Sequence, residues 1–243
     1  MNVLVMDTET TGLDATVDRI VEIATVPVAL NETQWCVKKG TDTLVNPGRK
    51  IPPEASAVHH LVDDDVVNSP DLAGAIAFIG LSDATVMVAH NAAYDRSFLP
   101  DLTHIPFICT YRCALHLWPD APGHGNQTLR YWRQLGLSEH LAEASSTRSM
   151  LPHSALFDSY TTAQILVDML QERSIDELIE LSQAPVVLTK ARFGKHAGKG
   201  WDWIVRADGG WCDWYMKLPD GDRDVRHTIE HHRNLLRRQP SLI

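Results

Sequence analysis

The sequence of 243 residues predicts an α/β protein in which helices pack on a mixed β-sheet, followed by a small carboxy-terminal α+β module. Three observations lead to this fold class. The chain begins with short runs rich in β-branched residues, helical periodicity then alternates with further short apolar runs, and residues 186–243 differ in composition from the rest. An apolar share of 44% and a charged share of 22% exclude disorder, collagen or a coiled coil for the whole chain.

The first three strands are expected near the amino terminus. Residues 2–6 form a short apolar run that ends at the turn Thr10-Thr11-Gly12, which is typical of a buried strand. Residues 20–30 and 34–45 are rich in β-formers and are separated by Asn31-Glu32-Thr33. This spacing predicts a meander with mostly antiparallel pairing.

Helices and strands alternate after the meander. Ser69 can cap a helix that has Pro70 at its first position, and apolar residues then recur at helical spacing (Leu72, Ile76, Ile79). Residues 85–89 and 105–109 are short apolar runs that predict the fourth and fifth strands. Alternation of this kind places helices against the faces of a sheet.

The next elements flank a stretch without periodicity. Asn126 is expected to cap a helix that stops before Gly136. Periodicity then fades from residue 139 to residue 152, and the polar segment 144–147 is expected to be a mobile loop. A long helix with an apolar face is predicted over residues 154–172.

A domain boundary is expected after the following short helix. Ser174 and Glu177 have the spacing of a capping box, and the helix they begin ends near residues 183–185. We therefore predict one domain over residues 1–183 and a module over residues 186–243.

The charge is distributed unevenly along the chain. The formal net charge of −9 argues against a polyanionic partner, because phosphate binding normally needs a basic surface. Residues 186–243, however, hold 11 Lys and Arg against 7 Asp and Glu, whereas residues 1–185 hold 11 against 24. The two segments thus carry +4 and −13, and the average hides opposite electrostatic characters.

No targeting or membrane segment is evident. The start of the chain reaches Asp7 too early for a signal peptide, and no apolar run approaches the roughly 20 residues that span a bilayer. The four cysteines have no metal-ligand spacing and fit a reducing compartment (Cys36, Cys109, Cys113, Cys212). We expect a cytoplasmic protein without a membrane partner.

Two carboxylates follow the first strand run. Asp7 and Glu9 are separated by one residue, so both side chains project from the same face of an extended chain. Adjacent carboxylates repel unless a cation lies between them, and hard oxygen ligands suit Mg²⁺ or Mn²⁺. Alone, the pair fits a solvated strand end better than a metal site, but here it follows a buried strand in which exposed acids are poorly tolerated.

Two further polar clusters lie at strand and helix ends. The segment His90-Asn91-Ala92-Ala93-Tyr94-Asp95 follows the fourth strand, which puts Asp95 in the first turn of a helix. A capping acid there is a simple alternative, and His90 and Asn91 are expected to be local hydrogen-bonding groups. His153 and Asp158 follow later, with His153 in the loop and Asp158 in the long helix.

The order of these clusters resembles the histidine-containing branch of the DEDD superfamily of 3′–5′ exonucleases, over roughly residues 1–172. The resemblance implies an RNase H-like domain in which four acids hold two divalent ions, Mg²⁺ or Mn²⁺, and a histidine is the general base. Those acids are here Asp7, Glu9, Asp95 and Asp158, and the histidine is His153. Two ions can stabilise both the attacking and the leaving oxygen of a phosphodiester, and a neutral imidazole can remove the proton of the attacking water.

The resemblance also implies substrate-binding residues. Thr10 and Asn91 lie within the matched motifs, and Leu13 matches the residue that typically packs against the terminal base. His59 lies in a segment similar to one beside the family's active site. A core leucine and a loop-fixing histidine are the alternatives for Leu13 and His59.

The carboxy-terminal module carries a motif of its own. The turn Phe193-Gly194-Lys195-His196-Ala197-Gly198-Lys199, followed by tryptophans, resembles the carboxy-terminal module of the exodeoxyribonuclease X group. We expect a β-hairpin followed by short helices, with Lys195 and Lys199 placed to meet a phosphate and exposed rings placed to stack on bases. The alternative is that the tryptophans only build the core of a small module.

Together these features predict a 3′–5′ exonuclease that releases 5′-mononucleotides from DNA 3′ ends, single-stranded or duplex. Trimming of RNA is the nearest alternative, because the same five residues serve both polymers and only a contact to the 2′-OH separates them. A polymerase proofreading subunit is the alternative of another class. The sequence identifies no protein partner.

Overall fold

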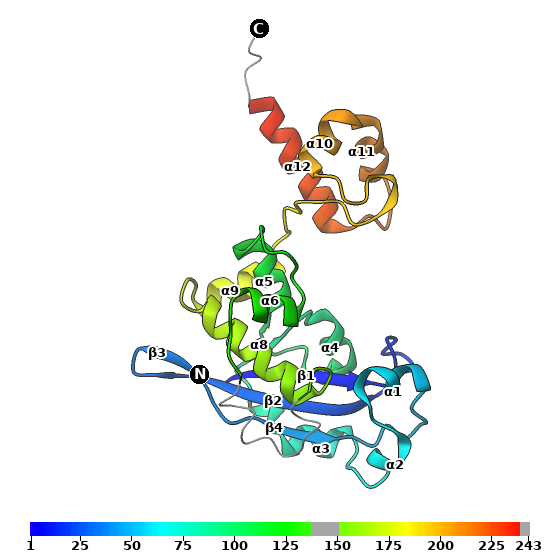
Figure 1. Ribbon diagram of the computed structural model, residues 1–243, viewed down its shortest axis with the longest axis vertical. Helices are drawn as coiled ribbons and strands as arrows, with labels where there is room; N and C mark the ends of the chain where they lie inside the picture. The colour runs from blue at the N-terminus through cyan, green and yellow to red at the C-terminus, as the bar shows by residue number, and fades with distance from the viewer. Residues whose placement is uncertain (138–150, 239–243) are drawn as a thin grey trace. The chain divides into compact units, whose positions relative to one another are not determined.

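The computed structural model describes residues 1–137 and 151–238 (Figure 1). The predicted mobile loop at 144–147 lies outside the described residues. The chain divides into two compact units, one made of Met1–Cys113 with Ala121–Ser182 and the other of Ala114–Asp120 with Gln183–Ile243. The last change of unit along the chain lies between Ser182 and Gln183, next to the domain boundary expected between residues 183 and 186.

The first unit is built on one mixed sheet with the strand order β3-β2-β1-β5-β6, and β4 pairs with β2 beside this path. β1 pairs antiparallel with β2 and parallel with β5, which in turn pairs parallel with β6. The predicted mixed sheet is therefore confirmed. The strands are β1 (Val3–Thr10), β2 (Ile20–Asn31), β3 (Gln34–Val37), β4 (Thr41–Leu44), β5 (Val86–Ala89) and β6 (Phe107–Cys109).

The strand expected over residues 34–45 is two strands. β3 and β4 both pair with β2, and the chain between them passes Gly40. A Cβ at Gly40 would lie 2.8 Å from both Leu156 Cδ1 and Val26 Cγ2, so the chain needs glycine at this close approach. The backbone N–H of Gly40 also donates to the hydroxyl of Tyr160 at 2.7 Å.

Helices cover both faces of the sheet. α8, which carries Tyr160, crosses the face of β1 and β2 (Figure 1). On the opposite face Leu4 and Met6 of β1 pack with residues of α3 and α4 in one buried apolar cluster. Within residues 1–137 and 151–183, the helices are α1 (Pro53–His59), α2 (Asp63–Val66), α3 (Leu72–Phe78), α4 (Ala93–Phe98), α5 (Thr110–Leu117), α6 (Asn126–Trp132), α8 (Ala155–Met169) and α9 (Ile175–Gln183).

The helix starts test the predicted caps. Ser174 and Glu177 form the predicted capping box, because the Ser174 N–H donates to Glu177 Oε2 at 2.8 Å and the Glu177 N–H donates to Ser174 Oγ at 3.3 Å. The cap of α3 was predicted wrongly. Its N-cap is Asp71, whose side chain accepts the Gly74 N–H at 2.9 Å, rather than Ser69. α6 begins at Asn126 with Gly125 as its N-cap, one residue from the prediction.

The carboxy-terminal module has its own helices and core. It contains α10 (Trp201–Ala207), α11 (Gly209–Met216) and α12 (Arg223–Arg238), with the fully buried Trp201, Ile204, Cys212 and Ile229 at their centre. The predicted hairpin is reduced to one antiparallel bridge between Lys190 and Gly200. Trp201 is buried, as the alternative that the tryptophans build the module's core predicts, whereas Trp203 and Trp214 are 47% and 54% exposed.

Two sequence expectations concern thiols and membranes. All four cysteines are free, in agreement with the expected reduced thiols. In the described stretches of the chain, no helix combines the length and apolar character needed to cross a bilayer.

Candidate active site

Four carboxylates from three elements converge at one end of β1. Asp7 and Glu9 lie on β1 itself, Asp95 lies in the first turn of α4, and Asp158 lies in the first turn of α8. One ligand-capable atom each from Glu9, His153 and Asp158 lies within 4.8 Å of the others. The structure thus brings together residues that are up to 151 positions apart, from Asp7 to Asp158.

A hydrogen bond from Thr8 of β1 orients the carboxylate of Asp95. The residue is only 3% exposed, and its Oδ1 accepts the hydroxyl hydrogen of Thr8 at 2.8 Å. Asn91, with a φ of +65°, turns the chain from β5 into α4, and its carbonyl accepts the Tyr94 N–H at 2.9 Å. Asparagine tolerates this left-handed conformation, so Asn91 shapes the turn that presents Asp95.

Asp158 is held by two donors. The backbone N–H of His153 donates to Asp158 Oδ2 at 3.0 Å, and the side chain of Gln127, at the start of α6, donates to Asp158 Oδ1 at 3.0 Å. Asn126 donates to the main-chain carbonyl of Asp158 at 3.2 Å. Sequence reasoning missed Gln127, because a lone glutamine in the first turn of a helix carries no spacing signal.

His153 lies beside these carboxylates at the surface. It has a φ of +63°, and its side chain is exposed. It lines an open pocket of about 300 Å³, whose other lining residues are Asp7, His90, Gly125, Asn126, Gln127, Thr128, Pro152 and Asp158. The imidazole is therefore open to solvent and to a substrate while it remains next to the acids.

The acids repel one another and are poorly solvated. Burial raises the pKa of Asp7 well above its ordinary value, and the nearby charges of Asp95, Asp158 and Glu9 raise this pKa further. Burial likewise raises the pKa of Asp95 to about 7, although the hydrogen bond from Thr8 lowers it. Burial also raises the pKa of Asp158, against the hydrogen bonds from His153 and Gln127.

His90 also lines this pocket and is held by two hydrogen bonds. Its Nδ1 lies 2.9 Å from Thr110 Oγ1 and its Nε2 lies 2.8 Å from the carbonyl of His124. Burial lowers the pKa of His90 to about 4, so the ring is uncharged at neutral pH. These contacts fit the expected role as a local hydrogen-bonding group.

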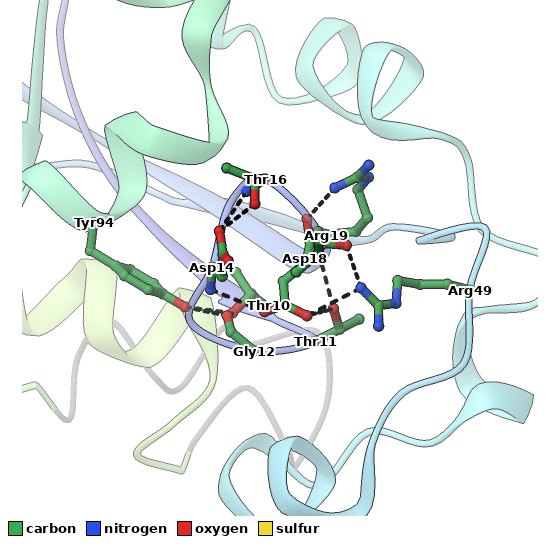
Figure 2. A network of polar contacts seen from close by, with 10 residues as sticks. Thr10, Thr11, Gly12, Asp14, Thr16, Asp18, Arg19, Arg49 and Tyr94 are labelled. Atoms are coloured by element: carbon green, nitrogen blue, oxygen red, sulfur yellow. Dashed lines mark hydrogen bonds and ion pairs between the residues drawn. The ribbon is translucent and has the colours of Figure 1, made fainter.

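The turn that follows β1 is organised around two hydrogen-bond acceptors, the Gly12 carbonyl and the Asp18 carboxylate (Figure 2). The hydroxyl of Thr10 donates to the Gly12 carbonyl at 2.7 Å, and the hydroxyl of Tyr94 donates to the same oxygen at 3.0 Å. Asp18 accepts the Thr11 hydroxyl and the Asp14 N–H, both at 3.0 Å. This network leaves Leu13 86% exposed at the tip of the turn, so the alternative of a core leucine is wrong.

His59 occupies a different environment. Its side chain is 1% exposed, and its Nδ1 accepts the Leu61 N–H at 3.1 Å. The structure therefore favours the loop-fixing alternative for His59 over a contact with substrate.

The two predicted phosphate-binding lysines lie in the carboxy-terminal module. Lys195 Nζ pairs with Asp208 Oδ2 at 2.7 Å, so part of its charge is already compensated. Lys199 Nζ lies 4.2 Å from the ring centroid of the exposed Trp203. A lysine and an exposed ring are thus combined beside the turns at Gly194 and Gly198, which have φ values of +62° and +83°.

The donor set fits divalent cations. Oxygen ligands dominate it, and burial disfavours the anionic forms of Asp7, Asp95 and Asp158, whose pKa values it raises, so a cation there would favour the ionised carboxylates. A cation held between Glu9 and Asp158 would offset the repulsion between their carboxylates, because one oxygen of each already lies within 4.8 Å of the other.

Comparison with known proteins identifies the family. The family model described as exonuclease, RNase_T, matches residues 4–166. The chain belongs to this exonuclease family. It is a 3′–5′ exonuclease, and the resemblance to the DEDD superfamily is confirmed.

Two relatives of the exonuclease support this assignment, one over nearly the whole chain and one over little more than half of it. The chain is 30% identical over 231 residues to exodeoxyribonuclease 10 of Escherichia coli K12, covering 94% of this chain and 97% of the relative. It is 35% identical over 146 residues to the DNA polymerase III subunit epsilon of Treponema pallidum, covering 56% of this chain and 66% of that one.

A solved structure confirms the fold of the exonuclease. Exonuclease X in complex with 5′-overhanging duplex DNA matches with a TM-score of 0.62 and 30% identity, covering 74% of this chain and 99% of that chain. The nuclease domain of 3′hExo, a DEDDh family member, matches with a TM-score of 0.51 and 16% identity, over 70% of this chain and 92% of that chain. The expected RNase H-like fold is therefore confirmed.

Proposed function

We propose that this exonuclease hydrolyses DNA from 3′ ends and releases 5′-mononucleotides, with two divalent ions, Mg²⁺ or Mn²⁺, and His153 as the general base. The observation that carries the proposal is the approach of His153 to Glu9 and Asp158, with one ligand-capable atom of each within 4.8 Å of the others, beside Asp7 and Asp95. An acidic pocket with one exposed imidazole is suited to activating water next to an anionic substrate.

Each acid has a place in this proposal. Asp7 faces the charges of Asp95, Asp158 and Glu9, so it would hold both ions, while Glu9 and Asp158 would hold one of them and Asp95 the other. When bound, the ions supply positive charge that stabilises the attacking and leaving oxygens. Thr8 and Gln127 keep the carboxylates of Asp95 and Asp158 oriented by direct hydrogen bonds.

His153 would remove the proton of the attacking water. The side chain is exposed and lines the pocket, so an imidazole nitrogen can reach a water in the pocket without a rearrangement of the sheet. Its backbone N–H is bound to Asp158, which keeps the base close to the acids. The imidazole must be neutral to act as this base.

The substrate assignment follows the relatives. Exodeoxyribonuclease 10 is named for deoxyribonucleic acid, and exonuclease X was solved in complex with duplex DNA. The match to the first of them covers 94% of this chain. Leu13 would pack against the terminal base from the tip of its turn, and Thr10 and Asn91 would support the backbone that the substrate meets. Lys195, Lys199 and the exposed rings of the carboxy-terminal module would hold the strand.

A timed digest tests the proposal. Purified protein with Mg²⁺ or Mn²⁺ receives DNA and RNA oligonucleotides of the same sequence with different labels in one tube, together with matched single-stranded and duplex 3′ ends. We expect faster loss of DNA, shortening from the 3′ end, 5′-mononucleotide products and no turnover with EDTA. Asp7→Asn should abolish turnover, whereas Asp64→Asn, an exposed carboxylate of α2, should not. Faster loss of RNA, or full activity of Asp7→Asn, would contradict it.

A further inference from the structure

A fifth carboxylate lies next to the site on the neighbouring strand. Glu22 of β2 is opposite Glu9 of β1 in the antiparallel register, so the two side chains share one face of the sheet. Glu22 is fully buried, with 0% of its surface exposed. Burying a carboxylate is costly unless hydrogen bonds compensate it, so this residue requires an explanation.

One compensating hydrogen bond comes from the start of α8. Glu22 Oε2 accepts the backbone N–H of Ala155 at 3.0 Å, across 133 residues of sequence. Ala155 is the first residue of α8 and is itself fully buried. The first N–H groups of a helix have no partner within the helix and carry partial positive charge, so a carboxylate is favourable there.

The position of this hydrogen bond connects it to the site. Ala155 comes two residues after His153 and three residues before Asp158. Between His153 and Ala155 lies the buried Ser154, whose extended φ and ψ of −118° and 133° lead the chain into the helix. A contact that fixes the backbone at Ala155 therefore fixes the segment on which both functional side chains are mounted.

Glu22 is oriented toward the helix rather than toward the ligand cluster. In the part of the chain that the structure describes, the group of ligand-capable atoms within 4.8 Å of one another consists of Glu9, His153 and Asp158, and Glu22 is outside it. Its charge still reaches the site, because it contributes to the raised pKa of Asp7 after burial and the three nearer acids.

We propose that Glu22 is a positioning residue: its buried carboxylate anchors the N-terminus of α8 at Ala155 and so sets the distance of His153 and Asp158 from Glu9. The inference rests on the metal-dependent function proposed above for these three residues. It adds that the ligand set is assembled by a contact between β2 and α8 before any ion or substrate is present.

The test uses the full chain, combines hydrogen exchange without metal with a separate Mn²⁺ titration, and needs no activity. Amide hydrogen exchange is followed by NMR in the wild type, Glu22→Gln, Glu22→Leu and the control Thr25→Val. Thr25 is also buried on β2, but its hydroxyl donates to the carbonyl of Ile79 at 3.1 Å. Its side chain points to the opposite face of the sheet from Glu22, because the two are three residues apart along the strand.

We expect the Ala155 amide of the wild type to exchange slowly, unlike an ordinary first amide of a helix. Glu22→Leu should speed exchange between residues 153 and 158 at least about tenfold and weaken Mn²⁺ binding, counted by EPR, by a similar factor. Glu22→Gln keeps an acceptor oxygen and should retain most of the protection, and Thr25→Val should not affect this segment.

Three results would overturn the proposal. The first is an unprotected Ala155 amide in the wild type, which is decisive even if Glu22→Leu fails to fold. The second is unchanged exchange and Mn²⁺ affinity in Glu22→Leu. The third is loss of Mn²⁺ binding in Glu22→Gln with protection intact, which would make Glu22 a ligand. Because exchange is measured without metal or DNA, these outcomes are separate from a failure of the proposed nuclease reaction.

Discussion

The backbone N–H of His153 donates to Oδ2 of Asp158 at 3.0 Å, so the proposed base and the proposed metal ligand are coupled through one loop. His153 adopts a left-handed backbone conformation, with a φ of +63°, to make this contact. Substitutions at this position must preserve the backbone if they are to report on the imidazole alone.

His153→Asn meets that requirement, because asparagine tolerates positive φ. We expect kcat to fall by roughly 10²–10⁴-fold with little change in unfolding temperature, and added imidazole to restore part of the rate. His60→Asn is the control, since His60 is also exposed and has a φ of +62°. Equal loss in both variants would contradict a role for the imidazole.

The buried acids predict how the stability of the metal-free protein depends on pH. The pKa of Asp95 is about 7 in the folded protein and lies near its ordinary value when unfolded. The folded state therefore binds more protons between these values, and stability is lost as pH rises toward and through 7. Thermal unfolding without metal should show a higher midpoint at pH 5 than at pH 8. Mn²⁺ should reverse the loss at pH 8, and Asp95→Asn should weaken the pH dependence; a midpoint independent of pH would oppose this account.

Thr8→Val tests the hydrogen bond that lowers the pKa of Asp95. Without the hydroxyl that pKa rises further, so more of the carboxyl is protonated at pH 7 and Mn²⁺ binds more weakly. We expect the pH midpoint of Mn²⁺ binding to move upward. Thr43→Val on β4 is the control, because the Thr43 hydroxyl donates to the Leu44 carbonyl instead. A midpoint that does not move would show that Asp95 does not control metal binding.

The turn below Leu13 should control substrate binding more than chemistry. In Gly12→Ala, the new Cβ would lie 2.4 Å from Asp18 Oδ2, which forces Asp18 out of its network. We expect KM for an oligonucleotide to rise roughly 3- to 10-fold, with a smaller change in kcat. Leu13→Ala should act in the same direction. Gly136→Ala is the matched control, since no atom of residues 1–137 or 151–238, beyond the glycine and its chain neighbours, lies within 4 Å of its Cβ position; an effect of equal size there would point to a general loss of stability.

The carboxy-terminal module should contribute affinity for long strands. Lys199→Ala and Trp203→Ala remove the stacked pair at 4.2 Å, and each should weaken binding of a single-stranded DNA 20-mer about tenfold. A trinucleotide offers few nucleotides beyond those held in the active site, so its rate of hydrolysis should change less. Lys217→Ala controls for loss of one exposed charge in the same module. Unchanged affinity in both variants would leave the module with a structural role only.

The positions of the acids were predictable because they lie at ends of strongly patterned elements. Local pattern places Asp7, Glu9, Asp95 and Asp158 after an apolar strand or at the start of a helix, whereas their proposed roles as ligands come from the resemblance to the DEDD superfamily. Gln127 was not predictable, because its importance comes from contacts with Asp158 that cross 31 residues. The same holds for the hydrogen bonds of Asp18 and Glu22, which depend on which loop or helix reaches them.

The fold shows the same division between local and long-range causes. The capping box at Ser174 needs only its own four residues and was predicted. The break between β3 and β4 depends on Gly40 meeting Leu156, a residue 116 positions away, and was missed. At α3 the sequence offers two good caps, Ser69 and Asp71, and local chemistry does not choose between them.

The wide separation of the four acids along the chain has a consequence for biosynthesis. Asp7 and Glu9 are translated early, but Asp158 and the start of α8 follow about 150 residues later. Asp158 cannot join the other acids before it has been made, and contacts of such long sequence separation form slowly, so we expect the nuclease centre to be completed late. A ribosome-bound chain stalled before α8 should therefore lack nuclease activity, and the nascent enzyme stays inert until most of its length has been made.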